Sequence, residues 1–515
     1  MIAAESSANS ILCRRHRPSS NRKESSPMNK KPNIILILSD DQGPFSLGCL
    51  HNSQLQTPNL DAMARDGARL SHCFCASPVC SPARASILTG SIPSRHGVHD
   101  WIRAGNLKPD AFGFSQEIKA HYDYLIENKA IDYLEGLPTY TQILADNGYT
   151  CALAGKWHLG DSVTPQCGFS KWYTIGKGGC DNYMDPDVIE DGKITFPREY
   201  ITDLITDKAI TFLDEMAQEE NPFYLSVHYI APHMPWDPSS HKQEHLDLYK
   251  DCDYEQYYPH LPDHPWANAG SRSYNTPEKR AWCFQGYEAA ITAMDEGVGK
   301  ILEHLNTLGI SDDTIVIFTS DNGFNMGHHG FFGKGNGTNP TNVYEESITV
   351  PFLATWNGHI PAGQVIEGCH SHLDLFPTIL DMAGIHYSLD ALQPGRSILP
   401  VLEGTQPDDG NAEVVIYDEY GTTRMIRTPE FKYVHRFPRG PHELYDLRKD
   451  PGEADNLYGR QEYDETILSL RRRLLNWFDR YADPARDGTK TDSHGTGQLC
   501  RCGPEAEQVQ VFYPD

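Results

Sequence analysis

The sequence contains no run of about 18 apolar residues, the length that a membrane-spanning helix requires. Residues 1–27 also lack the apolar core of roughly 7–15 residues that marks a secretory signal. They are rich in Ser, Arg and Asn, so we expect residues 1–30 to form a disordered N-terminal extension and treat Met28 as a candidate start. These absences predict a cytoplasmic protein without a membrane partner.

Positive charge is also scarce. The chain has 44 Lys and Arg residues against 70 Asp and Glu residues, which gives a net charge of −26. A field of this sign repels nucleic acid and anionic membrane surfaces, so neither is an expected partner. Any site for an anionic substrate must therefore gather its positive charge locally, inside a pocket.

The 13 cysteines show no pairing scheme. Cys73 with Cys75, and Cys500 with Cys502, form C-x-C pairs, but neither has a second pair at the spacing of a zinc site. Free thiols in a reducing compartment are the better interpretation.

The chain of 515 residues exceeds the roughly 250–300 residues at which a single core stops growing, so we expect two domains. Residues 31–39 read KPNIILILS, a continuous apolar run typical of a strand that is buried on both faces. Further strands are predicted over residues 149–154, 223–229 and 314–319, and helices over residues 57–67, 201–216 and 278–308. This alternation predicts an α/β domain over residues 31–405, with a doubly wound mixed sheet flanked by helices.

From about residue 405 the pattern changes to short strands separated by turns. We predict strands over residues 414–417, 423–427, 432–436 and 443–446, followed by an amphipathic helix over residues 465–481. The expected C-terminal domain, residues 406–515, is therefore a smaller α+β unit with an antiparallel sheet. Its tail from residue 483 is polar and reads as irregular.

Two of the predicted strands end in acidic residues. Asp40 and Asp41 follow the first strand, and Asp321 and Asn322 follow the strand over residues 314–319. Ligands bind at the carboxyl ends of strands in open α/β sheets, and carboxylate and amide oxygens suit Ca²⁺ or Mg²⁺. The alternative is that these residues only form turns or cap helices.

Residues 80–84 read CSPAR and open a helix, with Pro82 in its first turn. Cys80 would then lie at the positive end of the helix dipole, where oxyanions such as sulfate or phosphate are readily held. The alternative is an ordinary buried cysteine before a helix.

Residues 80–90, CSPARASILTG, resemble the first signature of the type I sulfatase family, in the alkaline phosphatase-like superfamily. In that family a maturation enzyme oxidises the cysteine to formylglycine. Residues 155–160, GKWHLG, resemble the second signature, and the similarity continues through residues 232–235 and 320–323 to Lys334. It covers roughly residues 32–460 in the order of the family.

The resemblance implies one divalent metal, Ca²⁺ with Mg²⁺ as the alternative, held by Asp40, Asp41, Asp321, Asn322 and the modified Cys80. Hydrated formylglycine would supply the nucleophile, and Arg84 would favour its deprotonation. Since a sulfate ester is shielded by oxygens, its hydrolysis needs cations where charge develops.

Those cations would be Lys156, His233 and Lys334. Either His233 or Lys334 would protonate the departing alcohol, and His158 would take a proton to expel sulfate.

The substrate beyond its sulfate is harder to assign. Residues 96–103 carry residue types that bind sugars, and we expect substrate contacts from His99, Asp100, Trp101 and Arg103. His328 and His329 are further candidates. A structural loop is the alternative in both places. The family usually has an Arg where Thr349 stands, which affects the local loop and the substrate preference.

The expected function is removal of sulfate from a small sulfated carbohydrate. An arylsulfatase, or a phosphonate or phosphate monoester hydrolase with the same site, is the first alternative. A catalytically silent metal-binding protein for sulfated ligands is the second. The sequence leaves the sugar, the hydroxyl position and the oligomeric state open.

Overall fold

The computed structural model describes residues 31–50, 52–107, 130–258, 260–388, 392–408, 416–506 and 509–514. The predicted extension over residues 1–30 lies outside these ranges. Contacts group residues 32–515 into one compact unit, which holds both the large sheet and the C-terminal sheet. The domain boundary between residues 405 and 406 stays a prediction.

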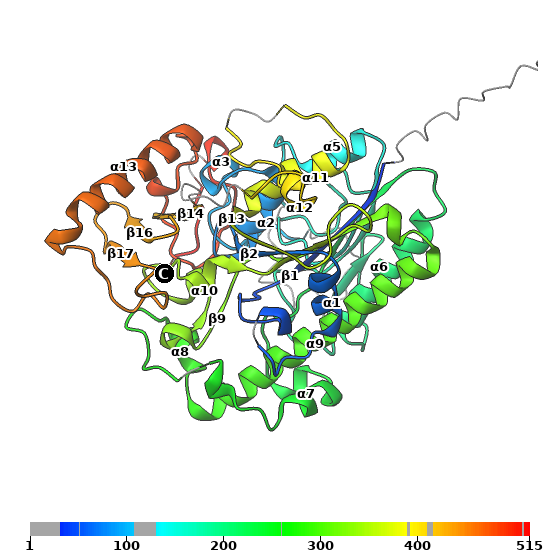
Figure 1. The fold of residues 1–515 in the computed structure, drawn as a ribbon, viewed down its shortest axis with the longest axis horizontal. Helices are drawn as coiled ribbons and strands as arrows, with labels where there is room; N and C mark the ends of the chain where they lie inside the picture. The colour runs from blue at the N-terminus through cyan, green and yellow to red at the C-terminus, as the bar shows by residue number, and fades with distance from the viewer. Residues whose placement is uncertain are drawn as a thin grey trace, which may run out of the picture. The chain divides into compact units, whose positions relative to one another are not determined.

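A large mixed sheet forms the centre of this unit (Figure 1). Its strand order is β11-β2-β12-β8-β1-β7-β3-β4-β5-β6, and β13 pairs with β2. Neighbouring strands from β8 to β4 run parallel, whereas β12 is antiparallel to both β8 and β2. The strands are β1 (Asn33–Ser39), β2 (Ala68–Phe74), β3 (Thr150–Gly155), β4 (Lys171–Thr174), β5 (Val188–Glu190), β6 (Lys193–Thr195), β7 (Phe223–His228), β8 (Thr314–Ser320), β11 (Thr349–Val350), β12 (Phe352–Thr355) and β13 (Gln364–Ser371).

Helices cover both faces of the sheet, as the continuous apolar run of β1 predicts. Ile34, Leu36 and Leu38 point into the core under α2 (Cys80–Thr89), α5 (Tyr140–Asp146) and α11 (Leu375–Met382). Ile35 and Ile37 point into the opposite core, under α1 (Pro58–Asp66), α6 (Ile201–Met216) and α9 (Pro277–Leu308). The predicted doubly wound α/β architecture is confirmed.

The C-terminal part also has its predicted form. Strands β14 (Ile416–Tyr420), β15 (Thr423–Arg427), β16 (Phe431–Arg436) and β17 (Glu443–Asp446) make an antiparallel sheet in sequence order. Helix α13 (Asp464–Tyr481) packs on it through residues four or so apart, namely Ile467, Leu470, Leu474 and Phe478. The first predicted strand, residues 414–417, lies partly outside the described residues.

The tail after α13 is irregular, as expected, but it is held against the rest of the chain by long-range contacts. Gln498 bridges to Ile102 on one side and to Phe512 on the other. Its side chain is fully buried, accepts from the backbone N–H groups of His99 and Asp100, and donates to the carbonyl of Gly97. The tail is thus bonded to the loop that follows the Cys80 helix, a long-range contact that local sequence patterns do not carry.

Within the described residues, no helix combines the length and apolar character that crossing a bilayer demands. The thiols of Cys73, Cys75 and Cys151 are buried and form no disulfide, as expected.

Helix α9 buries the carboxyl group of Glu288, and no positively charged side chain forms an ion pair with it among the described residues. Glu288 is 0% exposed, and its Oε1 accepts from Gln54 and Tyr258, while its Oε2 has no hydrogen-bond partner in the described structure. Burial raises the pKa of Glu288 to about 7, against the opposing effect of these hydrogen bonds. The carboxyl group of Glu288 therefore binds its proton more tightly in the folded state than in the unfolded state.

Replacing Glu288 with Gln, which does not ionise, should remove the contribution of this residue to the pH dependence of the free energy of unfolding. Because the pKa of Glu288 is raised on folding, the free energy of unfolding has its full value below about pH 4.5, where the carboxyl is protonated in both states. It falls as the pH rises through about 7, because the buried carboxyl must then ionise. We expect Glu288→Gln to match the wild type near pH 5 and to exceed its unfolding free energy by up to about 3 kcal/mol near pH 8. Urea unfolding at both pH values measures this, and a difference that does not change with pH would contradict it.

Candidate active site

The predicted acidic and basic residues meet at the carboxyl edge of the large sheet. Asp40 follows β1, Asp321 follows β8, and Lys156 follows β3. These strands are neighbours or next neighbours through β7, so their ends lie close together. The loop after β7 adds His233, and Lys334 directly follows the short strand β10 (Phe332–Gly333).

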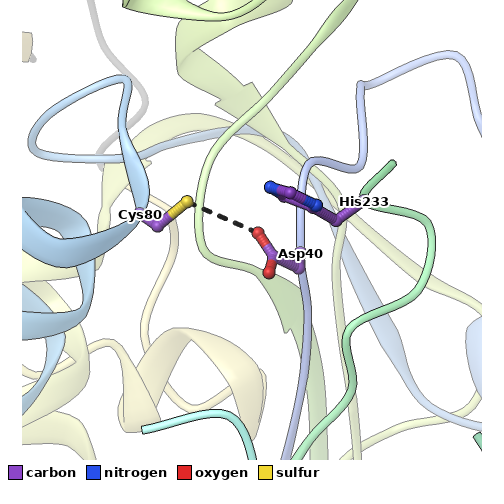
Figure 2. A group of neighbouring side chains, drawn as sticks. All are labelled: Asp40, Cys80 and His233. Carbon is purple, nitrogen blue, oxygen red and sulfur yellow. Dashed lines mark hydrogen bonds between the residues drawn. The ribbon is translucent and has the colours of Figure 1, made fainter. Parts of the chain in front are cut away.

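Cys80 is the first residue of α2 and faces this cluster. Figure 2 shows its sulfur directed at Asp40, with the ring of His233 beside that carboxylate, and one polar atom of each of the three residues lies within 4.8 Å of the others. The Sγ–Oδ1 distance is 3.6 Å, and the Nζ of Lys334 lies 2.6 Å from the same sulfur. Burial raises the pKa of the Cys80 thiol to about 12, although Lys156 and Lys334 oppose this effect.

Three carboxylates and three cations are buried together here. Arg84 donates from Nε to Asp321 at 2.9 Å, and its Nη2 lies 3.7 Å from Asp40. Lys156 is paired with Asp40, and Lys334 with Asp41. Burial alone would raise the pKa of Asp40, but Lys156 and the other cations more than offset it, so this pKa is lowered.

The acidic residues fit a hard divalent cation. Single oxygens of Asp40, Asp41 and Asp321 lie within 4.8 Å of one another. The Oδ1 of Asn322 is buried and has no partner in the described structure, while its amide donates to Asp41 at 2.8 Å. A buried amide oxygen without a donor in the described structure, beside three carboxylates, is a ligand set that suits a hard cation such as Ca²⁺ or Mg²⁺.

His158 is held as a neutral proton acceptor. Its Nε2 donates to the carbonyl of Ile102 at 3.0 Å, so Nδ1 carries a lone pair, and Nδ1 is buried without a partner in the described structure. Burial lowers the pKa of His158 well below its usual value, and Lys156 and Arg84 act in the same direction. The residue has a φ of 57°, a strained conformation of the kind found at functional sites.

A cavity of ≈ 490 Å³ opens onto these residues. That volume is within the range of small-molecule sites. Its wall holds the predicted residues Cys80, His158, His233, Lys334, Trp101 and Arg103, together with Asn106, Asn336 and residues 177–181, which the sequence analysis missed.

Residues 177–181 have one feature in their sequence that could have indicated a role at the site, namely the adjacent glycines Gly178 and Gly179. A Cβ on Gly178 would lie 2.3 Å from the ring of His158, and one on Gly179 would lie 3.2 Å from the ring of His233. The absence of a side chain at Gly178 therefore lets the backbone approach His158 closely, while the approach of Gly179 to His233 is close but less restrictive.

Four of the predicted substrate residues do not line the cavity, namely His99, Asp100, His328 and His329. The ring of His328 packs against that of Phe45 instead. His99 is buried and bonded to the carbonyl of Arg486, and Asp100 accepts from Tyr420. Burial raises the pKa of Asp100 to about 6. His329 pairs with Glu346 at 2.8 Å and stacks on a tyrosine ring. These side chains are engaged by other parts of the chain, which the local sequence did not indicate.

The unusual residue Thr349 begins β11 and pairs with Phe74 of β2. It is buried, and its hydroxyl has no partner in the described structure. It does not line the cavity.

Comparison with known proteins gives two family matches. The family model described as "Sulfatase" matches residues 32–385. A second, "N-sulphoglucosamine sulphohydrolase, C-terminal", matches residues 327–479, which include the C-terminal sheet.

Individual relatives agree along most of the chain. An N-acetylglucosamine-6-O-sulfatase of Bacteroides thetaiotaomicron is 28% identical over 90% of this chain and 89% of its own. An N-acetylgalactosamine-6-sulfatase of Mus musculus is 30% identical over 73% of this chain and 67% of its own. A solved structure described as a complex with its substrate D-glucosamine-2-N,6-O-disulfate is 26% identical, covers 90% of this chain and 100% of its own, and has a TM-score of 0.70.

Calcium should stabilise the folded protein. A ligand that binds only the folded state at about 100 times its Kd adds about 2.7 kcal/mol, so we expect Ca²⁺ to raise Tm and a chelator to reverse the rise. Asn322→Leu removes the amide oxygen without changing charge and should shrink the shift. Differential scanning fluorimetry with Ca²⁺ and with Mg²⁺ measures both. If neither Ca²⁺ nor Mg²⁺ changes the Tm of the wild type, the prediction of a metal site is wrong.

Proposed function

Because the chain belongs to the sulfatase family, we propose that it removes sulfate from a small sulfated sugar with a formylglycine formed from Cys80 and one divalent metal. That it is a sulfatase acting on sulfate esters follows from the family; the sugar, the modified residue and the metal are the proposal. The supporting observation is the position of Cys80, which opens α2, faces Asp40 and Lys334, and lines the cavity.

The names of the relatives support an amino sugar as the substrate. Two of them are 6-sulfatases of N-acetylated hexosamines, and the solved complex holds a sulfated glucosamine. The ≈ 490 Å³ cavity suits a ligand of about that size. We therefore propose a 6-sulfated hexosamine.

Formylglycine supplies a hydrated aldehyde whose hydroxyl is the nucleophile. A divalent metal, which Asp40, Asp41, Asp321 and Asn322 would hold, would supply positive charge at this site. Conversion of Cys80 requires a maturation enzyme as a partner. The buried thiols of Cys73, Cys75 and Cys151 support a reducing compartment such as the cytoplasm.

The chain's own cations hold the sulfate. Lys334 contacts residue 80 and lines the cavity, so its ammonium is available to a sulfate oxygen there. Lys156 and Arg84 lie behind it, with each fixed by a carboxylate, which keeps their charge in place as the negative charge of the substrate develops.

Two histidines handle protons. The Nδ1 of His233 donates to the carbonyl of Met234 at 2.8 Å, so Nε2, which lies 3.7 Å from Asp41, must carry the second proton of an imidazolium to protonate the departing alcohol. Lys334 is the other candidate for this donor. His158, with its free Nδ1, is the acceptor that helps to release sulfate.

The modification of Cys80 is tested by mass. In a host that has a formylglycine-generating enzyme, the peptide containing Cys80 should weigh about 18 Da less than the unmodified peptide, since SH and H are replaced by a carbonyl oxygen. Cys80→Ala should abolish sulfatase activity. An intact thiol in a host where a control sulfatase matures, or activity that survives in Cys80→Ala, would contradict the mechanism.

The role of His233 is tested by changing the leaving group. A sugar alkoxide needs a proton to depart, whereas a nitrophenolate does not. We expect His233→Ala to lower kcat by about 10²–10³ on a sugar sulfate and by much less on nitrophenyl sulfate. Lys334→Ala, measured in parallel, distinguishes the two candidate donors. Equal losses on both substrates in His233→Ala would remove this histidine from leaving-group protonation.

A further inference from the structure

We propose that Arg103, held in place by the C-terminal tail, binds a second oxyanion of the substrate. The preferred sugar would then carry a second sulfate or a carboxylate in addition to the sulfate that is removed. This inference rests on the proposed function and names the substrate class of the same site.

Arg103 shares the cavity wall with the reacting residue. It lines the ≈ 490 Å³ cavity together with Cys80, Lys334 and Trp101. Its backbone N–H donates to the carbonyl of Gln498 at 2.9 Å, so its position is set by the tail rather than by its own loop.

The tail also fixes the plane of the guanidinium group. The Nη1 of Arg103 donates to the carbonyl of Thr496 at 3.3 Å, and its Cζ lies 3.5 Å from the ring centre of Tyr513. The ring centre of Trp101 lies 5.7 Å from the same Cζ atom. A guanidinium held by one carbonyl and one aromatic face loses little freedom when it binds a ligand.

Tyr513 is itself anchored. Its N–H donates to the carbonyl of Gly497 at 2.8 Å, and its carbonyl accepts from the hydroxyl of Thr496 at 2.7 Å. Gly497 has a φ of 111°, and a Cβ there would lie 2.9 Å from the Cβ of Arg103 and 3.0 Å from the ring of Trp101. The tail backbone is thus packed directly against both cavity residues.

Among the described residues, Arg103 differs from the other cations of the cavity wall in having no acidic partner. Lys334 is paired with Asp41, and Lys177 with Asp181. Across the described ranges, by contrast, the hydrogen bond from Nη1 to Thr496 is the one polar contact of the Arg103 side chain, and no carboxylate forms an ion pair with it. In a chain of net charge −26, an arginine in the cavity wall that has no acidic partner among the described residues places positive charge where it can meet a ligand.

The free donors define the ligand. Nε and Nη2 of an arginine form a fork that matches two oxygens of a sulfate or a carboxylate, and such bidentate pairs are stronger than a bond to a neutral hydroxyl. Sulfate and carboxylate groups both occur on sugars, and both are oxyanions that this fork can bind. The predicted ligand is therefore a second oxyanion of the sugar, separate from the sulfate that is removed.

The test compares three substrates: glucosamine 6-sulfate, glucosamine 2-N,6-O-disulfate, and a 6-sulfated glucosamine linked to a uronic acid. For Arg103→Gln, we expect kcat/KM to fall by about 10–10² on a substrate with the second oxyanion, mainly through KM, and to stay within about threefold on glucosamine 6-sulfate. The arm that shows the loss identifies sulfate or carboxylate.

The tail provides a matched pair of variants. Tyr513 is 42% exposed at the end of the chain, so its replacement leaves the core intact. Tyr513→Ala should reproduce the selective loss in weaker form, and Tyr513→Phe, which keeps the aromatic face, should not. This pair also decides the question if Arg103→Gln fails to fold.

The outcomes separate the two proposals. A wild type that hydrolyses none of the three sulfate esters would overturn the proposed function. A wild type that hydrolyses them, with an Arg103→Gln variant that loses nothing or loses equally on all three, would overturn the subsite and leave the sulfatase assignment standing.

Discussion

Buried charge at the carboxyl edge of the large sheet is the constraint on which the site depends. The carboxylates of Asp40 and Asp321 are fully buried, as is the ammonium of Lys156. A buried charge that loses its partner destabilises the fold by several kcal/mol, so each must meet an opposite charge in good geometry. Negative and positive side chains from distant segments are therefore held at fixed positions before any substrate arrives, which is the preorganisation that electrostatic catalysis requires.

The scaffold meets this constraint with regular elements. Parallel strands β1, β7, β8 and β3 end at one edge and deliver the acidic residues and Lys156, while α2 brings Cys80 to the same point with its positive end. Gly178 and Gly179 then bring a loop against His158 and His233. Arg84 of α2 connects this helix to the ends of two strands, because it donates to Asp321 after β8 and to the carbonyl of Lys156 after β3.

The C-terminal part is joined to the site by polar contacts as well as by packing. Lys432 of β16 is fully buried and pairs with Glu345, just before β11, and with Glu453. Farther along, the tail bonds the loop that carries Trp101 and Arg103. A segment that seems remote from the nucleophile in sequence thus shapes the wall of its cavity.

Much of the fold could be predicted because it depends on local pattern. The strand run before Asp40 and the helix over residues 201–216 were predicted nearly to the residue, since a doubly buried strand and an amphipathic helix have distinct periodicities. Strands β2 and β13 were missed. Their burial is uneven and they pair with each other across almost 300 residues, so no short window reveals them.

The sequence by itself determined the chemical inventory: which residues can carry charge, which cysteine opens a helix, and which strands end in carboxylates. The tertiary structure alone decided how that inventory is divided. His99 and Asp100 have the same sugar-binding character as Trp101 and Arg103, yet the tail and Tyr420 take the first two out of the cavity and leave the others in its wall. The physical reason is that burial and hydrogen bonding are satisfied by partners hundreds of residues away, which a local pattern cannot specify.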